Sequence, residues 1–240
     1  MGVGTILVIN ANTSISMTKG IEASAQKVAS RGTKIITVSS KRGPRTIEGP
    51  VDQAFSIPGM LEIAKELEGQ FHGIISACFG DPGLEALKLA FGVPVIGIRE
   101  SSFLLASLIG NNFSIITPVS GTERKLRNFA REKGMEDKLL SVEYAGVTVS
   151  DLETGLPRIE EFIYKSAREA IKKGADVLIF GCAGMGKIVD KVSSRLDVPC
   201  IDPIGSAIKI MEGILHFCSD KRSKGVPLKK EMIGYPDWSL

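Results

Sequence analysis

Short apolar runs rich in β-branched residues alternate along this chain with longer stretches whose apolar positions recur every three or four residues. This alternation is typical of parallel strands joined by crossover helices, so we expect an α/β fold. The expected strands are residues 5–10, 34–39, 72–77, 93–98, 113–117, 139–144, 176–180 and 198–201. The expected helices are residues 14–30, 84–91, 120–133, 157–173, 187–196 and 205–218, with a further helical stretch interrupted at Pro58.

Two of the helix starts carry specific signals. Asp81 followed by Pro82 is typical of an N-cap and a first helical position. Ser120 followed by Glu123 has the spacing of a capping box. Between the two series of elements, residues 99–111 are expected to form the connection.

The second series of elements repeats the first. Asn10, at the end of the first strand, precedes Cys78 by nearly the same interval that separates Thr117 from Cys182. Each cysteine directly follows an expected strand and is followed, at a nearly equal spacing, by a Val-Pro pair. The two cysteines therefore occupy equivalent positions in two half-chains, as in an internal repeat.

The composition is that of an ordinary globular chain of 240 residues, 43% of them apolar and 24% charged. Its 30 basic and 27 acidic residues are spread along the chain, which gives no electrostatic footprint for nucleic acid. No basic leader region is present, and no apolar run approaches the roughly 18 to 20 residues that span a bilayer. We therefore expect a cytoplasmic protein whose partner is a small-molecule substrate rather than a nucleic acid or a membrane.

The four cysteines suggest neither disulfides nor a metal site. Free thiols are expected without a secretion signal, and the lack of a CxxC spacing and the presence of only two histidines, His72 and His216, argue against zinc. Both histidines are interpreted as structural. The glycine-rich residues 181–186 follow the order GxxGxG rather than the GxGxxG of dinucleotide sites, and no P-loop pattern occurs. No metal or nucleotide cofactor is expected.

Cys78 and Cys182 are the candidate catalytic residues. In open parallel sheets the ligand crevice lies beyond the carboxyl ends of the strands, and a helix N-terminus after each cysteine would lower the pKa of its thiol. A lone strand-end cysteine is usually a small core residue, but two at equivalent positions can face one substrate from opposite sides. Such a pair suits racemisation or epimerisation next to a carbonyl, with one thiolate removing a proton and the other thiol delivering one.

Polar groups near the same strand ends are candidates for holding the substrate. Asn10, Asn12 and Thr13 follow the first strand, and Thr117 has the equivalent place in the second half. A turn with an N-cap explains them equally well. Backbone N–H groups after the cysteines are candidate donors to a developing negative charge; these belong to Gly80, Gly83, Gly184 and Gly186. The weaker candidates are Glu48, Glu100 and Ser101.

Residues 77–84 (ACFGDPGL), 181–185 (GCAGM) and 10–13 (NANT) resemble the hydantoin racemase branch of the aspartate/glutamate racemase superfamily, and the resemblance covers nearly the whole chain. It implies two flavodoxin-like halves, each a mostly parallel sheet flanked by helices, with the active site in the cleft between them and no cofactor. It also implies a C-terminal helix that returns to the first half. The first half would then comprise residues 1–99 and 206–240, and the second residues 100–205. Chains of this superfamily commonly form homo-oligomers.

The resemblance further implies that Cys78 and Cys182 are the acid/base pair. The substrate contacts that it implies are Asn10, Asn12, Thr13, Phe79, Gly80, Asp81, Gly83, Thr117, Ala183 and Gly184. Ala11 stands where this branch often has proline, which loosens the loop but removes no polar group.

The residues after the cysteines bear on the substrate. Amino-acid racemases of the superfamily usually show Cys-Asn-Thr and Cys-Thr-Glu or Cys-Thr-His there, whereas this chain has Phe79-Gly80 and Ala183-Gly184. Free aspartate or glutamate is thus disfavoured and is kept as a second substrate class. A hydantoin ring fits better because its amide edges can pair with backbone groups. Allantoin and apolar 5-substituted hydantoins both contain this ring, and the sequence does not decide between them.

Two further functions stay open. One is a decarboxylase or cis-trans isomerase of the same superfamily, against which the presence of both cysteines argues. The second is a non-catalytic binding protein on the same scaffold, which would not need cysteines at both strand ends.

Overall fold

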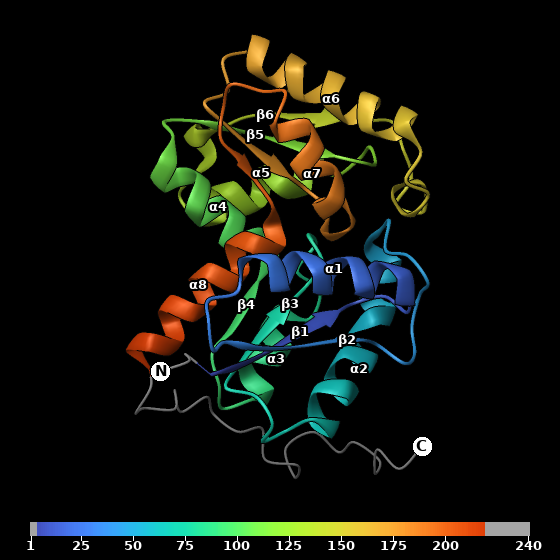
Figure 1. Cartoon of the computed structure of the whole chain (residues 1–240), viewed down its shortest axis with the longest axis vertical. Coiled ribbons are helices and arrows are strands. Elements are labelled where there is room, and N and C mark those ends of the chain that lie inside the picture. The colour runs from blue at the N-terminus through green and yellow to red at the C-terminus, as the bar shows by residue number, and fades with distance from the viewer. Residues whose placement is uncertain (1–3, 219–240) are drawn as a thin grey trace.

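Eight strands form two four-stranded sheets in the computed structural model of the chain, which describes residues 4–218 (Figure 1). The first sheet has the order β2-β1-β3-β4 and consists of β1 (Thr5–Asn10), β2 (Lys34–Ser39), β3 (Gly73–Ser76) and β4 (Val95–Gly97). The second has the order β6-β5-β7-β8 and consists of β5 (Phe113–Thr117), β6 (Leu139–Tyr144), β7 (Val177–Phe180) and β8 (Cys200–Ile201). Neighbouring strands are parallel throughout. The predicted α/β class with two similar halves is confirmed.

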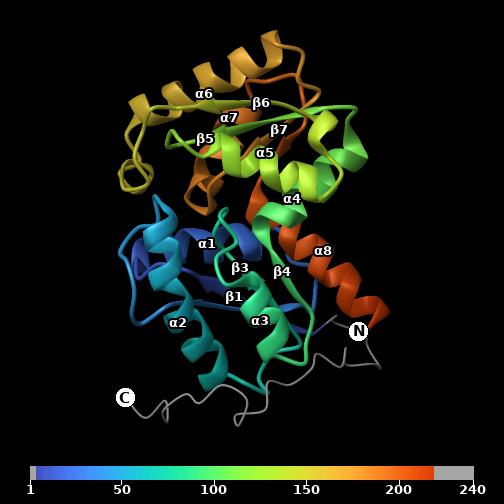
Figure 2. The same cartoon turned by 180° about the vertical axis from the view of Figure 1, so that it is seen from behind.

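Helices connect the strands of each sheet (Figure 2). In the first half these are α1 (Ile15–Val28), α2 (Pro50–Glu66) and α3 (Leu84–Ala90). In the second half they are α5 (Glu123–Glu132), α6 (Pro157–Lys172) and α7 (Gly186–Ser193), with short 3-10 helices at Glu136–Lys138, Asp151–Glu153 and Ala183–Met185. Two more helices, α4 (Ile98–Ile109) and α8 (Pro203–Phe217), follow the last strand of each sheet. Within residues 4–218, no helix combines the length and the apolar character needed to cross a bilayer.

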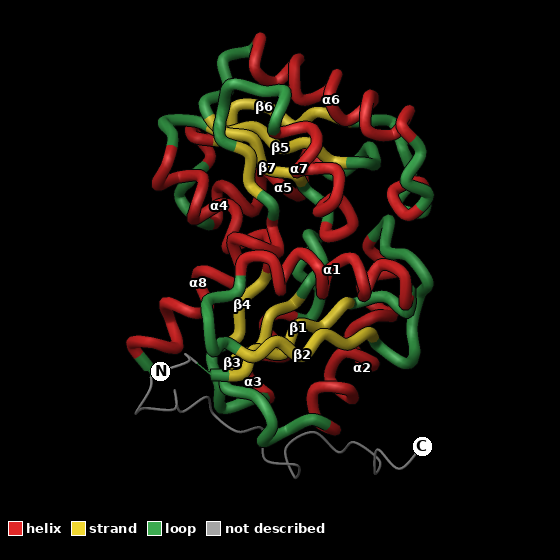
Figure 3. Tube along the Cα trace, in the orientation of Figure 1, coloured by secondary structure: helices red, strands yellow, loops and turns green. Residues whose placement is uncertain are grey.

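The strands are apolar on both faces, as expected for parallel strands covered by helices on both sides. Along β1, Ile6 and Val8 face a central apolar cluster, whereas Leu7 and Ile9 face an outer one with α2 and α3. The central cluster also contains side chains from α1, α4, α5, α8, β5 and β7, so both halves contribute to it. A second outer cluster packs α6 and α7 on the other face of the second sheet. Figure 3 shows α1 lying between the two sheets.

Helix α4, which follows β4 of the first sheet, packs against the second half through aromatic contacts. Phe103 is fully buried, and its ring centroid lies 5.1 Å from those of both Phe113 and Phe129 in edge-on contacts. The hydroxyl groups of Ser102 and Ser206, 3.3 Å apart, link α4 to α8. Residues 99–111 connect the first sheet to the second, as expected, and most of this segment is a helix whose buried face belongs to the central cluster.

A polar contact joins the halves at the other side of the molecule from α4. Glu153, in the segment before α6, accepts hydrogen bonds from the hydroxyl groups of Ser14 and Ser16 at 2.6 and 2.5 Å. Both serines lie at the start of α1, which Figure 1 shows at the opposite side from α4. The cleft between the halves therefore has a packed apolar joint at one end and an exposed hydrogen-bonded contact at the other.

Helix α8 follows the second sheet but packs against α1, β3 and β4 of the first half. It begins at Pro203, earlier than expected, because the Asp202 side chain accepts hydrogen bonds from the N–H groups of Ile204 and Gly205. The predicted division of the chain into two halves stays a prediction. Its first half comprises residues 1–99 and 206–240, of which residues 219–240 lie outside the described residues, and its second half comprises residues 100–205.

Helix α2 continues through Pro58, so the expected interruption is wrong. A proline within a helix removes one backbone N–H donor and crowds the preceding turn. The helix nevertheless continues from Pro50 to Glu66. Gly59, the next residue, approaches Ser40 and the carbonyl of Arg42 so closely that a Cβ would overlap them. The residue after the proline therefore packs closely against the loop after β2.

Truncation of Phe103 to alanine should lower the free energy of unfolding by about 3–5 kcal/mol, because it removes a fully buried ring from the shared core. Leu104 is 43% exposed, and Leu104→Ala is the matched control, with an expected loss below about 1 kcal/mol. Urea unfolding followed by circular dichroism measures both. Equal losses in the two variants would contradict the role of α4 as the apolar joint.

Candidate active site

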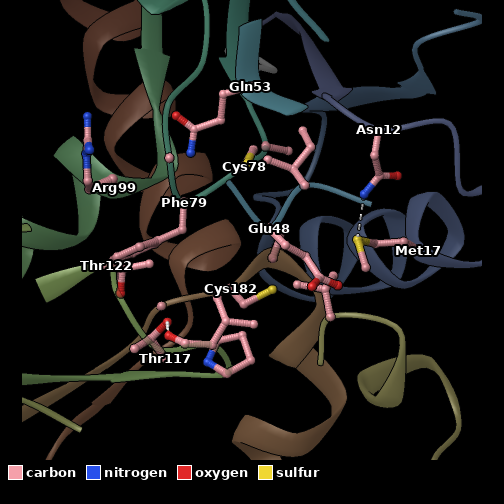
Figure 4. Close-up of a pocket in the computed structure, with 18 of the residues that line it drawn as sticks. Asn12, Met17, Glu48, Gln53, Cys78, Phe79, Arg99, Thr117, Thr122 and Cys182 are labelled. Carbon is pink, nitrogen blue, oxygen red and sulfur yellow. Dashed lines mark hydrogen bonds between the residues drawn. The ribbon is translucent and has the colours of Figure 1, made fainter. Parts of the chain in front are cut away.

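The central strands of both sheets end at one cavity of about 90 Å³, lined by residues of both halves (Figure 4). Cys78 lies two residues beyond β3, and Cys182 lies two residues beyond β7. Figure 4 shows the two cysteines on opposite sides of the cavity. Since one buried water needs roughly 10–15 Å³ on this scale, the space suits a small organic ring.

Most of the predicted site residues line this cavity. They are Asn10, Asn12, Cys78, Phe79, Gly80, Thr117, Cys182 and Ala183. Thr13, Asp81, Gly83 and Gly184 do not line it. Thr13 instead donates its N–H to the carbonyl of Pro44 at 3.0 Å, and Gly83 caps α3 in a left-handed conformation with φ 65°. The role of the lining residues as substrate contacts stays a prediction.

The two asparagines are held in a turn at the start of α1. The Asn10 amide donates to Asn12 Oδ1 at 2.8 Å and to Thr18 Oγ1 at 3.0 Å. Asn12 Oδ1 also accepts the N–H of Ser14 at 2.9 Å, and its amide nitrogen lies 3.1 Å from Met17 Sδ. The interpretation of this segment as a turn is therefore correct, while both side chains also border the cavity.

Burial dominates the acidity of the two thiols. It raises the pKa of Cys78 to about 11 and that of Cys182 to about 12. The backbone N–H groups of Gly80 and Gly184 hydrogen-bond the respective sulfurs and lower each pKa by less than burial raises it. The expected lowering of the thiol pKa is therefore wrong. Only Cys182 directly precedes a helix, the short one at Ala183–Met185, whereas a turn separates Cys78 from α3.

Charged groups surround the two cysteines unequally. Asp81 raises the pKa of Cys78, while the positive charges of Lys125 and Arg99 lower it. Among the described residues, Cys78 itself is the charged neighbour that affects the pKa of Cys182, which it raises. The positive charge near the site is thus concentrated on the side of Cys78.

Asp81 anchors the turn after Cys78 to α4. Its carboxylate accepts the N–H groups of Arg99 and Glu100 at 3.2 and 3.1 Å, and it lies 3.5 Å from Arg99 Nε. The prediction that Asp81 caps the helix of residues 84–91 is wrong, because the carboxylate reaches the next helix instead. A Cβ at Gly97 would overlap this carboxyl group. Burial raises the pKa of Asp81 to about 7, against the opposing effect of Arg99.

Sequence reasoning missed several cavity residues, because a polar side chain on a helix normally indicates a solvated face and an apolar side chain normally indicates the core. The polar and charged ones are Gln53, Arg99, Thr122 and Lys125, and the apolar ones include Met17, Ile47, Val149 and Leu126. Thr122 Oγ1 and Arg99 Nε are buried without a hydrogen-bond partner among the described residues. The repeat is the signal that could have located some of them, since Met17 and Lys125 follow equivalent strands.

The three weaker candidates, Glu48, Glu100 and Ser101, do not all lie at the cavity. Glu48 lines the cavity, whereas Glu100 accepts the N–H of Gly97, and Ser101 donates to the carbonyl of Gly97. His72 accepts the N–H of Thr5 at 3.0 Å, in agreement with a structural role. No group of three or more His, Cys, Asp or Glu side chains in residues 4–218 is arranged as a set of metal ligands.

Known proteins resemble the chain over most of its length. The family model described as Asp/Glu/Hydantoin racemase matches residues 6–211. A hydantoin racemase of Pseudomonas sp. (strain NS671) is 36% identical over 234 residues, which cover 95% of this chain and 94% of that protein. The solved structure of an allantoin racemase from Klebsiella pneumoniae matches with a TM-score of 0.85 and 33% identity, over 89% of this chain and 88% of that one. The solved structure of an allantoin racemase from Pseudomonas fluorescens matches with a TM-score of 0.87 and 29% identity, over 96% of this chain and 100% of that one.

Asp81→Asn should flatten the pH dependence of stability between the ordinary aspartate pKa of 3.8 and about 7. In that window folded Asp81 holds a proton that the unfolded chain has lost, so the wild-type free energy of unfolding falls as the pH rises, by at most roughly 4 kcal/mol. Urea unfolding at several pH values compares the wild type, Asp81→Asn and the exposed control Asp137→Asn. An unchanged slope in Asp81→Asn would contradict burial as the dominant influence on this carboxyl.

Proposed function

The chain belongs to the Asp/Glu/hydantoin racemase family and is a racemase of the hydantoin type, and on that premise we propose that it inverts the 5-position of a hydantoin without a cofactor. One of Cys78 and Cys182 removes the proton from one face of the ring as a thiolate, and the other delivers a proton to the opposite face as a thiol. Allantoin and 5-substituted hydantoins are the candidate substrates.

The observation that carries this proposal is the placement of the two thiols. Both follow the equivalent strand of their half at the same offset, and both line one cavity from opposite sides. Because inversion needs proton transfer on two faces of one carbon, a pair of facing acid/base groups can complete it while the substrate stays in one position. A single buried cysteine would serve only one of the two faces.

The raised pKa of the thiols suits the substrate. A proton on carbon next to a carbonyl is only weakly acidic, and the strength of a base follows the pKa of its conjugate acid. Burial therefore makes the thiolate of Cys78 or Cys182 a stronger base, at the cost of a smaller thiolate fraction at neutral pH. The same burial excludes water, which would otherwise compete for the proton.

Negative charge develops on a ring carbonyl oxygen when the proton leaves, and it needs donors already in place. The N–H groups of Gly80 and Gly184 are engaged by the cysteine sulfurs. Thr122 lines the cavity with a buried hydroxyl that has no partner among the described residues. We assign this hydroxyl as the donor to the carbonyl oxygen.

An amino-acid racemase is the second candidate. The cavity holds a carboxylate, Glu48, and an amine, Lys125, neither of which forms an ion pair with another described residue. Opposite charges of this kind match the ends of a zwitterion. A non-catalytic binding protein is the third candidate, and it predicts binding without any exchange of the substrate proton.

The proposed chemistry requires two reduced thiols, which favours a reducing compartment. This supports the prediction of a cytoplasmic location. The absence of a cofactor also stays a prediction. Assembly into a homo-oligomer also stays a prediction.

The test incubates the protein with L-5-benzylhydantoin, (S)-allantoin or L-aspartate in deuterated buffer and follows optical rotation and α-proton exchange. We expect loss of rotation with deuterium incorporation for at least one hydantoin. Cys78→Ser and Cys182→Ser should each reduce racemisation by about 10²- to 10⁴-fold, because each removes one acid/base group. Cys200→Ser, outside the cavity, is the matched control. Full activity in either cavity variant would refute the two-cysteine mechanism, and no exchange with any hydantoin would refute the substrate class.

The pH profile gives an independent check. Since free Cys78 has a pKa of about 11, kcat/KM should rise roughly tenfold per pH unit through the neutral and mildly alkaline range, until the substrate itself ionises. Initial rates at substrate concentrations well below KM measure this slope. A profile that is flat across the neutral range would contradict a buried thiol as the base.

A further inference from the structure

The helix that follows the first strand of each sheet places its third residue on the cavity. This residue is Met17 in α1 and Lys125 in α5. Met17 contacts the turn after Cys182 in the second half, whereas Lys125 contacts α2 of the first half, beside the turn after Cys78. A thioether and an ammonium group therefore occupy equivalent places in the repeat, each across the cleft from its own half.

Lys125 is held over the turn that follows Cys78. Its amine donates a hydrogen bond to Gln53 Oε1. The Gln53 amide packs against Gly80 so closely that a Cβ at Gly80 would overlap it, and the N–H of Gly80 bonds the Cys78 sulfur. Lys125 forms no ion pair with another described residue, whereas Arg99 has Asp81 at 3.5 Å. Lys125 is thus a cation near Cys78 that forms no direct ion pair among the described residues.

Cys182 has an apolar side chain at the equivalent place. Met17 is 5% exposed, and its Cε lies 3.2 Å from the position that a Cβ on Gly184 would occupy. The N–H of Gly184 bonds the Cys182 sulfur, so the two cysteines have the same backbone partner. The side chain across the cleft, Lys125 near Cys78 and Met17 near Cys182, is therefore one difference between them, beside Asp81 and Arg99 near Cys78.

We infer that Lys125 is a positioning residue that sets the order in which the two cysteines lose their protons, so that the first thiolate forms at Cys78 and Cys182 stays the acid. The charged and titratable groups that face Cys78 are Asp81, Arg99, Lys125, Glu48 and Cys182. Asp81 raises the pKa of the Cys78 thiol, whereas Lys125 and Arg99 both lower it. With Lys125 near Cys78 and Met17 near Cys182, the charge of Lys125 favours a thiolate at Cys78 over one at Cys182.

This order has a mechanistic meaning that rests on the proposed racemase function. The resting protein then accepts the enantiomer whose proton faces Cys78, and one turnover leaves the thiolate at Cys182. A proton must then pass to Cys182 and another must leave Cys78 before the protein can convert a second molecule of the same enantiomer. Because enantiomers have equal free energies, kcat/KM must be equal in both directions at equilibrium, so the asymmetry has to be measured on the thiols themselves.

The experiment alkylates the protein without substrate, using iodoacetamide over a series of pH values, and quantifies each cysteine by peptide mass spectrometry. The thiolate is the reacting form, so Cys78 should react at lower pH than Cys182. In Lys125→Met, the rate at Cys78 at fixed pH should fall by about threefold to tenfold. The rate at Cys182 should stay within experimental error. Circular dichroism confirms that the variant is folded.

Two further variants separate charge from structure. Lys125→Arg keeps the charge and should retain the wild-type profile, and Arg124→Met removes an exposed cation from the same turn of α5 and should also leave it unchanged. An unaltered rate at Cys78 in Lys125→Met, or equal losses at both cysteines, would overturn the inference. Alkylation needs no turnover, so the two proposals can fail separately. Racemisation of hydantoins without the expected alkylation pattern would refute the inference alone. The expected alkylation pattern without racemisation of any substrate would refute only the proposed function.

Discussion

The apolar cluster shared by the two halves is the constraint on which the site depends. Side chains in a close-packed interior cannot shift freely, and the central cluster contains side chains of both sheets together with the buried Phe103 of α4. The strand ends that carry Cys78 and Cys182 are therefore held at a set separation. Proton transfer to either face of one carbon tolerates little displacement, and two domains that met only through a polar interface would move relative to each other.

Much of the fold follows from local patterns, and the exceptions are long-range contacts. The apolar strands and the equivalent spacing of the two cysteines are visible in the sequence, because parallel strands buried on both faces read as continuous apolar runs. The sequence pattern assigns the capping role of Asp81 to the nearest helix, whereas its carboxylate serves α4, which lies beyond the next strand. Likewise, Thr122 and Lys125 reach the cavity only because the second half folds over the first.

The acidity of the cysteines shows how two physical effects compete. Donors at the end of a strand favour a thiolate, and the structure contains them at Gly80 and Gly184. Transfer of the sulfur from water into the cavity disfavours the charge more strongly. Local sequence identifies the donors, while the extent of burial is a property of the assembled halves. The direction of the shift was therefore beyond the reach of sequence patterns.

The contact between Gly97 and Asp81 links two positions that no local pattern connects. A side chain at position 97 would occupy the space of the carboxyl group that caps α4. A lineage that acquired a larger residue at position 97 would therefore also have to shorten or replace the residue at position 81, and would lose the anchor of the Cys78 turn in doing so. Covariation of these two positions among homologous chains is the evolutionary trace that this packing should leave.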